Sequence, residues 1–533
     1  MAPKLSPHAF TRFWDLHAWV GVIGGLVLYI MFFAGALTLF HGELEVWQEP
    51  LAQEPPSRVS HQGLFERALA KLPLQPESVW FQPSATRAAQ IGYTDPKTDT
   101  WRQFLFDVQT DRLIEERERL ADFLYGLHFL WHEVTGDWLY RLSGFLAVAL
   151  LLALVTGVLI HLKDIVRQFH QFRPDKSRRV LWSDMHKVLG VMGLPFQAMY
   201  GFTGALIVLG PLLVGAFVEP VFGGHSKRAE AELLGWTGEA EGKAGAPAAV
   251  LSLDELLARA RRVEPDLALE GFSVRHPGRA GGTVDVHGPV RGATPESHGT
   301  VRLRLVDGSV LKVDSPATES ASGATWRWVR GLHYAYFGGR PLRFLFFALA
   351  LATCATILTG NWVWLARREA RRESPGNVVL AGLTVGVGAG TLVATAVLFL
   401  VSRLLPLDFQ GRGRTEEIVF VSVLGFCVIW ACVVENRRAL WWQGLGLAGV
   451  LLLPVPLLAA RWSPAGLFGP GPTNPAVVGV DIAILVVGLV LCGAAFALRR
   501  ALVQAAGAAP AEPDEEDVVE RSSALASAGG RNA

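Results

Sequence analysis

Cysteine is scarce in this sequence, with four residues among 533. All four lie within apolar runs, and no two of them have the spacing of ligands to one metal. Neither an iron–sulfur centre nor a disulfide framework is therefore indicated. We interpret these residues as small packing residues of helices. They are Cys354, Cys427, Cys432 and Cys492.

Charge of either sign is also in short supply. Charged residues make up 18% of the chain, and 49 lysines and arginines nearly cancel 48 acidic residues. This balance gives no indication of a nucleic-acid partner. Hydrophobic residues, by contrast, reach 51% and gather in long runs.

Eight of these runs are long enough, at about 20 residues, to cross a hydrocarbon layer roughly 30 Å thick. The sequence therefore predicts an α-helical polytopic membrane protein with about eight transmembrane helices surrounded by lipid. No small-residue cleavage site follows the first run, so we expect that run to be retained. The runs cover approximately residues 18–40, 139–161, 187–210, 342–366, 378–402, 416–434, 439–460 and 476–498.

Basic residues predict the orientation of the chain. Lysine and arginine crowd the segments after the second, fourth, sixth and eighth runs, and such loops face the cytoplasm. Alternation then places both termini inside and two large polar segments, 41–138 and 211–341, outside. In a bacterium this describes a multi-pass inner-membrane protein with two periplasmic segments. Residues 503–533 are rich in Ala, Pro, Glu and Ser, which predicts a disordered cytoplasmic tail.

An internal repeat organises the first two-thirds of the chain. Asp15-Leu16-His17, Gly21 and Gly35-Ala36-Leu37 reappear with identical spacing as Asp184-Met185-His186, Gly190 and Gly204-Ala205-Leu206. A second pair matches Gly126-Leu127-His128 and Thr156-Gly157 to Gly331-Leu332-His333 and Thr359-Gly360, with a gap of two residues. Each half therefore consists of a helix, an external domain and a helix, and both halves have the same orientation. This predicts a parallel repeat about an axis along the membrane normal.

The external segments have similar patterns, which predict two small α+β domains. In the first, residues 61–72 predict a short helix, and 78–81, 90–93 and 102–108 predict strands. In the second, 253–263 predicts an amphipathic helix, and 300–306 and 310–313 predict a hairpin around Asp307-Gly308-Ser309.

A family resemblance becomes specific at this point. The stretches VRLRLVDGSVLKVDSP and WRWVRGLHYAYFGG, with the twin openings DLHAWVG and DMHKVLG, resemble the PepSY-associated transmembrane family over roughly residues 10–370. That family includes inner-membrane ferric-siderophore reductases and iron-regulated proteins whose four-helix core holds b-type haem. The resemblance implies two PepSY-like periplasmic domains and about two haem b groups, and it leaves the last four helices unassigned.

The resulting division of the chain has nine parts. It runs as 1–40 for the first helix, 41–138 for the first external domain, 139–162 for the second helix, 163–186 for a basic cytoplasmic loop, 187–210 for the third helix, 211–341 for the second external domain, 342–366 for the fourth helix, 367–502 for a four-helix extension and 503–533 for the tail.

Histidines at both membrane faces are the candidate haem ligands. Bis-histidine ligation needs two neutral imidazoles that face each other from different helices. His17 and His186 are equivalent in the repeat and form one predicted pair, and His128 and His333 form the other. Glycines beside them are expected to make room for a flat macrocycle, although such residues also serve ordinary helix contact. These are Gly21, Gly24, Gly25, Gly190 and Gly193.

Three further histidines are secondary candidates. His132 lies one turn beyond His128, His161 ends the second apolar run, and His41 ends the first. The repeat disfavours all three, because its other half has no histidine at the matching positions.

A haem at each face predicts vectorial electron transfer. By resemblance, the acceptor is ferric iron in a siderophore, whose oxygen ligands hold Fe(III) better than Fe(II). The short cytoplasmic loops carry no dinucleotide fingerprint, so the donor is expected to be a quinol or a partner reductase. The alternatives are a haem-free membrane anchor with regulatory PepSY-like domains and, third, a transporter. The helices of the repeat lack the buried ionisable residues at mid-membrane depth that a coupled transport site usually shows. Asp481, in the last run, is expected near the outer interface.

Overall fold

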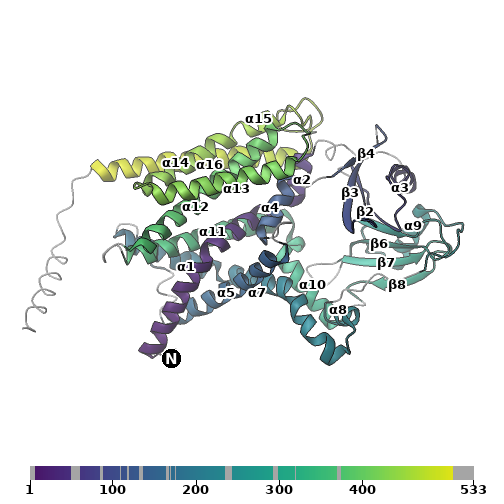
Figure 1. Cartoon of the computed structure of the whole chain (residues 1–533), viewed down its shortest axis with the longest axis horizontal. Coiled ribbons are helices and arrows are strands. Elements are labelled where there is room, and N and C mark those ends of the chain that lie inside the picture. Colours follow the sequence, from purple (N-terminus) through teal and green to yellow (C-terminus); the bar gives the residue numbers. More distant parts are fainter. Residues whose placement is uncertain are drawn as a thin grey trace, which may run out of the picture.

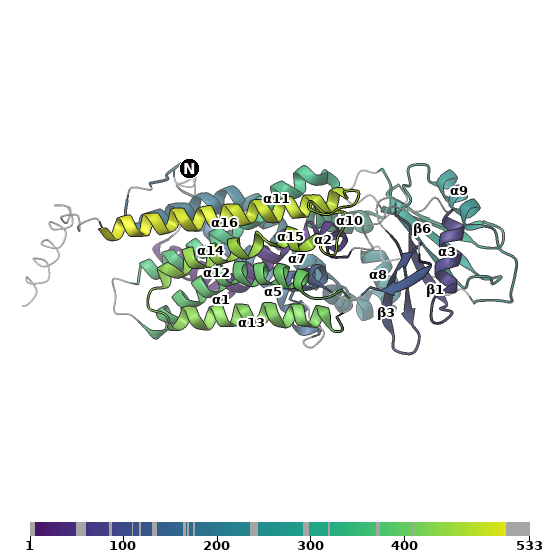
Figure 2. The same ribbon diagram turned by 90° about the horizontal axis from the view of Figure 1, so that it is seen from above.

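The structure is a computed structural model of the chain. It describes residues 6–507 except 50–59, 85–87, 109, 117–118, 131–135, 164–166, 168–169, 174–175, 235–242, 292–297, 318–319, 369–373 and 408. A bundle of long helices forms one part, and a β-sheet stands at one end of that bundle (Figures 1 and 2). We call this end of the bundle the sheet end and the opposite end the far end.

Eight spans of the described chain are helical, long and apolar enough to cross a membrane, as the sequence predicts. Several helices continue beyond their apolar runs; the 45 residues of α7 are about 68 Å long, more than twice the thickness of a hydrocarbon core. The spans are α1 (Pro7–Thr38), α5 (Asp137–His161), α7 (Arg178–Phe222), α11 (Gly339–Ala366), α12 (Pro375–Leu404), α13 (Arg412–Val433), α14 (Arg437–Leu452) continued by α15 (Val455–Ala459), and α16 (Pro475–Gly507).

The last helix corrects one predicted boundary. Residues 503–507, assigned above to the tail, belong to the end of α16. The remainder of the predicted tail lies outside the described residues.

The four helices of the repeat form a ring. Helix α1 packs against α5 and α11, and α7 packs against the same two helices. A Cβ atom on Gly24 would lie 3.3 Å from Leu146 on α5, and one on Gly25 would lie 3.2 Å from Ile357 on α11. These two glycines therefore permit close helix contact, which is the ordinary use of small residues in membrane bundles.

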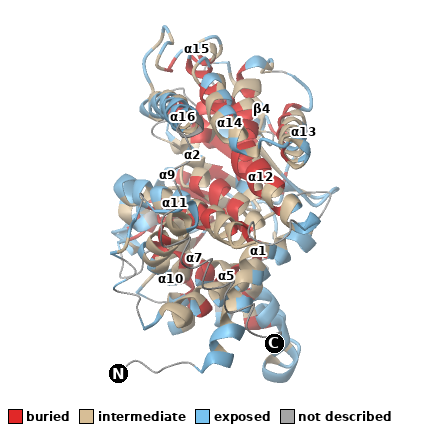
Figure 3. Ribbon diagram, turned by 90° about the vertical axis from the view of Figure 1, so that its left-hand side faces the viewer, coloured by how far each residue is buried: buried red, intermediate tan, exposed pale blue. Residues whose placement is uncertain are grey.

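Helices α12–α16 form a second layer beside this ring (Figure 1). The central member is α12, of which 78% of the apolar span is buried inside the protein (Figure 3). It contacts α1 and α11 on one side and α13 and α14 on the other. Polar contacts cross this boundary: the Tyr29 hydroxyl donates to the Gly388 carbonyl at 2.9 Å, and the Asn361 amide donates to Thr384 at 3.2 Å.

The described strands form one antiparallel sheet and not two separate domains. The strand order is β4-β3-β2-β1-β5-β6-β7-β8, so the two halves join where β1 pairs with β5. This corrects the expectation of two independent α+β units. The strands are β1 (Ser78–Gln82), β2 (Ala89–Asp95), β3 (Thr100–Asp107), β4 (Arg112–Glu115), β5 (Gly271–Arg275), β6 (Thr283–Pro289), β7 (His298–Arg304) and β8 (Val310–Asp314).

A single core runs across the junction of the two halves. Helices α3 (His61–Ala70) and α9 (Leu253–Val263) lie on the side of the sheet away from the bundle (Figures 1 and 2). Phe81 and Phe272 come from opposite sides of the junction, and their ring centroids are 5.3 Å apart. Both rings are fully buried in a hydrophobic cluster that also contains side chains of both helices. The predicted amphipathic helix at 253–263 is confirmed, and it completes this shared core.

Short helices connect the sheet to the bundle. They are α2 (His41–Gln48) and α4 (Leu120–His128) in the first half, and α8 (Ser226–Leu234), α10 (Ala321–Tyr334) and the 3-10 turn η2 (Tyr336–Gly338) in the second. Two of the four candidate histidines lie on these connectors, at the ends of α4 and α10 that reach the bundle.

Candidate cofactor sites

The far end of the ring brings His17 and His186 together. Their ring centroids are 6.0 Å apart, with an interplanar angle of 72°. The Nδ1 atom of His17 lies 2.8 Å from the Ala153 carbonyl oxygen, and Nδ1 of His186 lies 2.9 Å from that of Thr356. A backbone carbonyl only accepts, so each Nδ1 must donate its proton. Both Nε2 atoms of the neutral rings therefore carry a free lone pair.

The sheet end brings together His128 and His333 in the same way. Their ring centroids are also 6.0 Å apart, with an interplanar angle of 38°. His128 donates from Nδ1 to the Met31 carbonyl at 2.8 Å. His333 Nδ1 lies 2.9 Å from the hydroxyl of Thr203, whose own proton goes to the Met199 carbonyl at 2.7 Å. Since that hydroxyl has one proton, it accepts from His333, and Nε2 is again the unprotonated nitrogen.

These distances fit one metal ion between each pair of rings. Imidazole nitrogens bind metals at about 2 Å, and each ring centre lies about 1 Å behind its nitrogen, which gives roughly 6 Å between centres. A hydrogen bond from the other ring nitrogen is the usual partner of a metal-binding histidine, because it fixes the tautomer and orients the ring. All four residues have such a bond. The donor set therefore suits a bis-histidine haem at each end.

Glycines of the repeat contact the four imidazoles directly. A Cβ on Gly157 would lie 3.1 Å from Cε1 of His17, and one on Gly360 would lie 3.0 Å from Cε1 of His186. At the sheet end, a Cβ on Gly35 would lie 2.6 Å from Nδ1 of His128, and one on Gly204 would lie 3.4 Å from Cε1 of His333. Equivalent glycines thus allow equivalent histidine rings to pack against the helix backbone in the two halves.

Open space lies beside the far-end histidines. Gly21 and Gly190 each follow a histidine by one helical turn. A Cβ on Gly21 would meet nothing within 4 Å, and one on Gly190 would meet only a methyl of Thr356 at 3.8 Å. The expectation that these glycines make room for a macrocycle stays a prediction. Gly193, by contrast, accommodates the side chain of Gln197.

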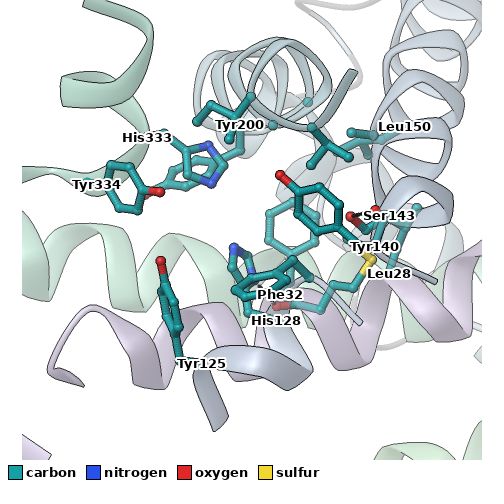
Figure 4. A pocket seen from close by; sticks show the side chains of 17 residues that line it. Leu28, Phe32, Tyr125, His128, Tyr140, Ser143, Leu150, Tyr200, His333 and Tyr334 are labelled. Carbon is teal, nitrogen blue, oxygen red and sulfur yellow. Dashed lines mark hydrogen bonds between the residues drawn. The ribbon is translucent and has the colours of Figure 1, made fainter. Parts of the chain in front are cut away.

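A cavity of about 180 Å³ adjoins the sheet-end pair (Figure 4). His128 and His333 project into it from different helices, below and above it in this view. Four of the seven tyrosines of the chain line the cavity, together with apolar residues of α1, α5 and α7. The cavity is thus mainly apolar with hydroxyl groups along its walls. The tyrosines are Tyr125, Tyr140, Tyr200 and Tyr334.

The secondary histidine candidates have other surroundings. His41 lies between two carboxylates, with Nδ1 3.7 Å from Glu45 and Nε2 3.8 Å from Asp122. Nearby, burial raises the pKa of Glu116, and the charges of Glu45 and Asp122 raise it further. His41 therefore belongs to an acidic cluster that links α2 to α4. His161 is the last residue of α5 at the far end, and His132 lies outside the described residues.

Two features of the structure were not predicted from the sequence. Thr203 stands where the first half of the repeat has Ala34, and this polar exception beside Gly204 was a usable signal. Asp481, near the start of α16, is fully buried, and its carboxylate accepts from Trp47 Nε1 at 2.8 Å and from the Leu467 amide at 2.9 Å. Its partner on α2 comes from a distant part of the sequence, so no local pattern reveals the pairing.

Eight membrane helices, an attached antiparallel sheet and two facing histidine pairs define a multi-pass membrane protein with internal duplication. The chain belongs to the family described as the PepSY-associated TM region, which matches residues 14–367. It is also similar to an uncharacterised protein of Pseudomonas aeruginosa, with 31% identity over 405 residues that cover 73% of this chain and 96% of the relative. The resemblance drawn from the sequence motifs is thereby confirmed at the level of the family.

Proposed function

We propose that the chain is a haem-binding electron carrier of the bacterial inner membrane, with one bis-histidine site at each face. The observation that carries this proposal is the shared geometry of the two pairs. In both, the imidazoles lie 6.0 Å apart and every Nδ1 is engaged in a hydrogen bond, which leaves Nε2 as the ligand atom. Bound haem would supply reversible one-electron chemistry at each pair.

The protein contributes position and environment to these sites. His17 and His186 would hold one haem, and His128 and His333 the other. Their Nδ1 hydrogen bonds maintain the neutral tautomer and raise the basicity of the ligating nitrogen. The surrounding apolar helices exclude water, which is one of the means by which proteins set a haem potential.

The two sites are spaced to serve opposite faces of a membrane. Gly35, which contacts His128, follows His17 by 18 residues of the same helix, a distance of about 27 Å along the axis. This compares with about 30 Å for the hydrocarbon core. Basic residues cluster in the loop 163–177 at the far end, which favours a cytoplasmic far end and a periplasmic sheet.

Electrons would therefore enter at the far end, from a quinol or a partner reductase, and leave at the sheet end. The cavity beside His128 and His333 lies between the bundle and the connectors to the sheet, so it is the exit that an external acceptor would reach. By resemblance to the ferric-siderophore reductases, that acceptor is siderophore-bound ferric iron, whose reduction to Fe(II) weakens the hold of hard oxygen ligands.

A reduced-minus-oxidised absorption spectrum tests the haem assignment. The wild-type protein, purified in detergent, is expected to show a b-type spectrum with about two haems per chain. The single variants His17→Ala and His333→Ala are each expected to lose about one haem, and His276→Ala, at the residue that follows β5, serves as the matched control. A well-folded preparation without haem would overturn the proposal and favour the alternative of a haem-free regulatory anchor.

A further inference from the structure

The short helix that ends at His128 caps only part of its own N-terminus, where the Asp122 carboxylate accepts from the Arg119 amide at 3.1 Å. Helix α4 has nine residues, fewer than an isolated helix needs for stability in water. Its N-cap residue is Arg119, whereas Ser, Thr, Asp and Asn are the residues that normally cap a helix. The first backbone amides of α4 must therefore find acceptors elsewhere, because they have none within the helix.

Those acceptors come from other helices. The amide of Leu120 donates to Glu416 Oε2 at 2.8 Å, and the amide of Ala121 donates to the Gln48 side chain at 3.0 Å. Glu416 belongs to α13 and is fully buried. A helix of the extension thus places a carboxylate at the positive end of α4, where a negative charge is stabilising.

Through Arg412, the same carboxylate is also linked to the C-terminal end of α12. Arg412 Nε donates to Glu416 Oε1 at 3.1 Å, its Nη1 donates to the carbonyls of Leu405 and Pro406 at 3.2 and 3.1 Å, and its Nη2 donates to the Ser402 carbonyl. These carbonyls lie at the C-terminal end of α12, which carries partial negative charge. From α12 through Arg412 and Glu416 to α4, charges of alternating sign therefore connect two helix dipoles inside the protein.

Packing reinforces this connection. Leu120, Ala121 and Leu124, on one face of α4, are buried in a cluster with residues of α12, α13 and α16. The rings of Phe123 and Phe420 meet edge to face at 5.1 Å between centroids. The N-terminal turn of α4 is thus held by the extension, while its last residue, His128, lies at the sheet-end site.

The equivalent helix of the second half is held differently. Helix α10, which carries His333, is capped by its own Ser320, whose hydroxyl accepts from the Gly323 amide at 3.1 Å. Its main packing partners are α7 and α8, which both lie outside the extension. At the sheet end, the extension therefore holds the short helix of one ligand, His128, whereas the helix of His333 is held mainly by the repeat.

We propose that helices α12–α16 position α4, and through it His128, so that Glu416 is a positioning residue for the sheet-end site alone. This inference rests on the proposed function, since it concerns the haem held by His128 and His333. It gives a role to the four membrane spans that lie beyond the matched family region.

The test compares three forms of the full-length protein. Glu416→Gln keeps an oxygen for the Leu120 amide but loses the charge. The double variant Arg412→Met with Glu416→Met removes both charges together, which buried pairs tolerate, and also removes the acceptor. Glu417→Gln, the next residue of α13, is the matched control for loss of one negative charge.

Two readouts are needed. Hydrogen exchange in peptides covering 120–128 is expected to be about tenfold faster in the double variant, as for a lost cap, with α10 unchanged. Redox titration is expected to show a shifted or missing sheet-end haem and an unaltered far-end haem. The Gln variant should fall between the double variant and the wild type.

The outcomes separate this inference from the proposed function. Unchanged exchange in α4, or equal loss of both haems, would overturn the positioning role even in a haem-loaded protein. A wild-type protein without haem would overturn the proposed function, and the exchange measurement would then still report whether Glu416 holds α4.

Discussion

Among the four paired histidines, three are oriented by backbone carbonyls and one by a side chain. His17, His128 and His186 donate to main-chain oxygens of a neighbouring helix, which no side-chain substitution can remove. His333 depends on the hydroxyl of Thr203. This difference makes the orientation of one ligand accessible to mutation without touching the ligand itself.

Thr203→Val is therefore expected to weaken the sheet-end site. Valine has nearly the same shape, but it leaves the Nδ1 proton of His333 without an acceptor. Loss of such an outer hydrogen bond typically lowers metal affinity by about 10- to 100-fold. The measurement is the rate of haem loss from each site, with Thr203→Ser as the control that keeps the hydroxyl. Equal rates in the Val and Ser variants would show that the bond does not orient the ring.

Alanine substitutions at the glycines beside the imidazoles are expected to reduce haem binding to different degrees, because the added methyl group lies at different distances from the rings. In Gly35→Ala the new methyl would lie 2.6 Å from Nδ1 of His128, too close for the ring to stay in place. In Gly204→Ala it would lie 3.4 Å from His333, which is nearly ordinary contact. We expect loss of most of the sheet-end haem absorbance in the first variant and little in the second. Gly42→Ala, which meets nothing within 4 Å, is the control. A similar loss in all three would contradict the assigned contacts.

The pairing of the histidines was predictable because the repeat preserves spacing. Identical offsets place His17 and His186 at the same height of equivalent helices, and the glycines that seat the rings recur with them. What escaped prediction were the Nδ1 acceptors. Three of these acceptors are backbone carbonyls. Every residue has such a group, so the residue type at those positions does not indicate the hydrogen bond.

At the scale of elements, the main surprise is the single sheet. Local patterns predicted a helix and strands in each external segment, and these agree with α3, α9, β1–β3, β7 and β8. The pairing of β1 with β5 joins residues nearly 200 positions apart. Period-two patterns describe which face of a strand is buried but not which edge it pairs with, so they left the two halves separate.

The junction of the two halves is expected to be the most sensitive point of the sheet. Phe272→Ala removes a fully buried ring that contacts both Phe81 and Phe65. Such truncations cost about 3–5 kcal/mol. The free energy of opening, from hydrogen exchange of β1 and β5, should fall by that amount. Val310→Ala, on the exposed edge strand β8, should change it by no more than about 0.5 kcal/mol. If both variants behave alike, the shared core does not join the halves.

At the scale of the whole molecule, the chain combines a duplicated ring with an added layer of helices. The duplication supplies two histidine pairs with equal separations between ring centroids, and the pairs lie apart by about the thickness of a hydrocarbon core. The added layer contacts mainly the first half, through α1, α2 and α4, and it also contacts α11 of the second half. An almost symmetric core thus becomes asymmetric at the sheet end, where the proposed acceptor would approach.

Electron transfer across a vesicle membrane tests the central claim most directly. The haem-loaded protein is reconstituted with a reductant trapped inside and a membrane-impermeant ferric chelate outside, and Fe(II) formation is followed. We expect Fe(II) outside vesicles that hold the wild-type protein, and background rates with His17→Ala or His333→Ala, because each variant breaks one of the two sites. Wild-type vesicles that retain both haems but reduce no external iron would contradict the account.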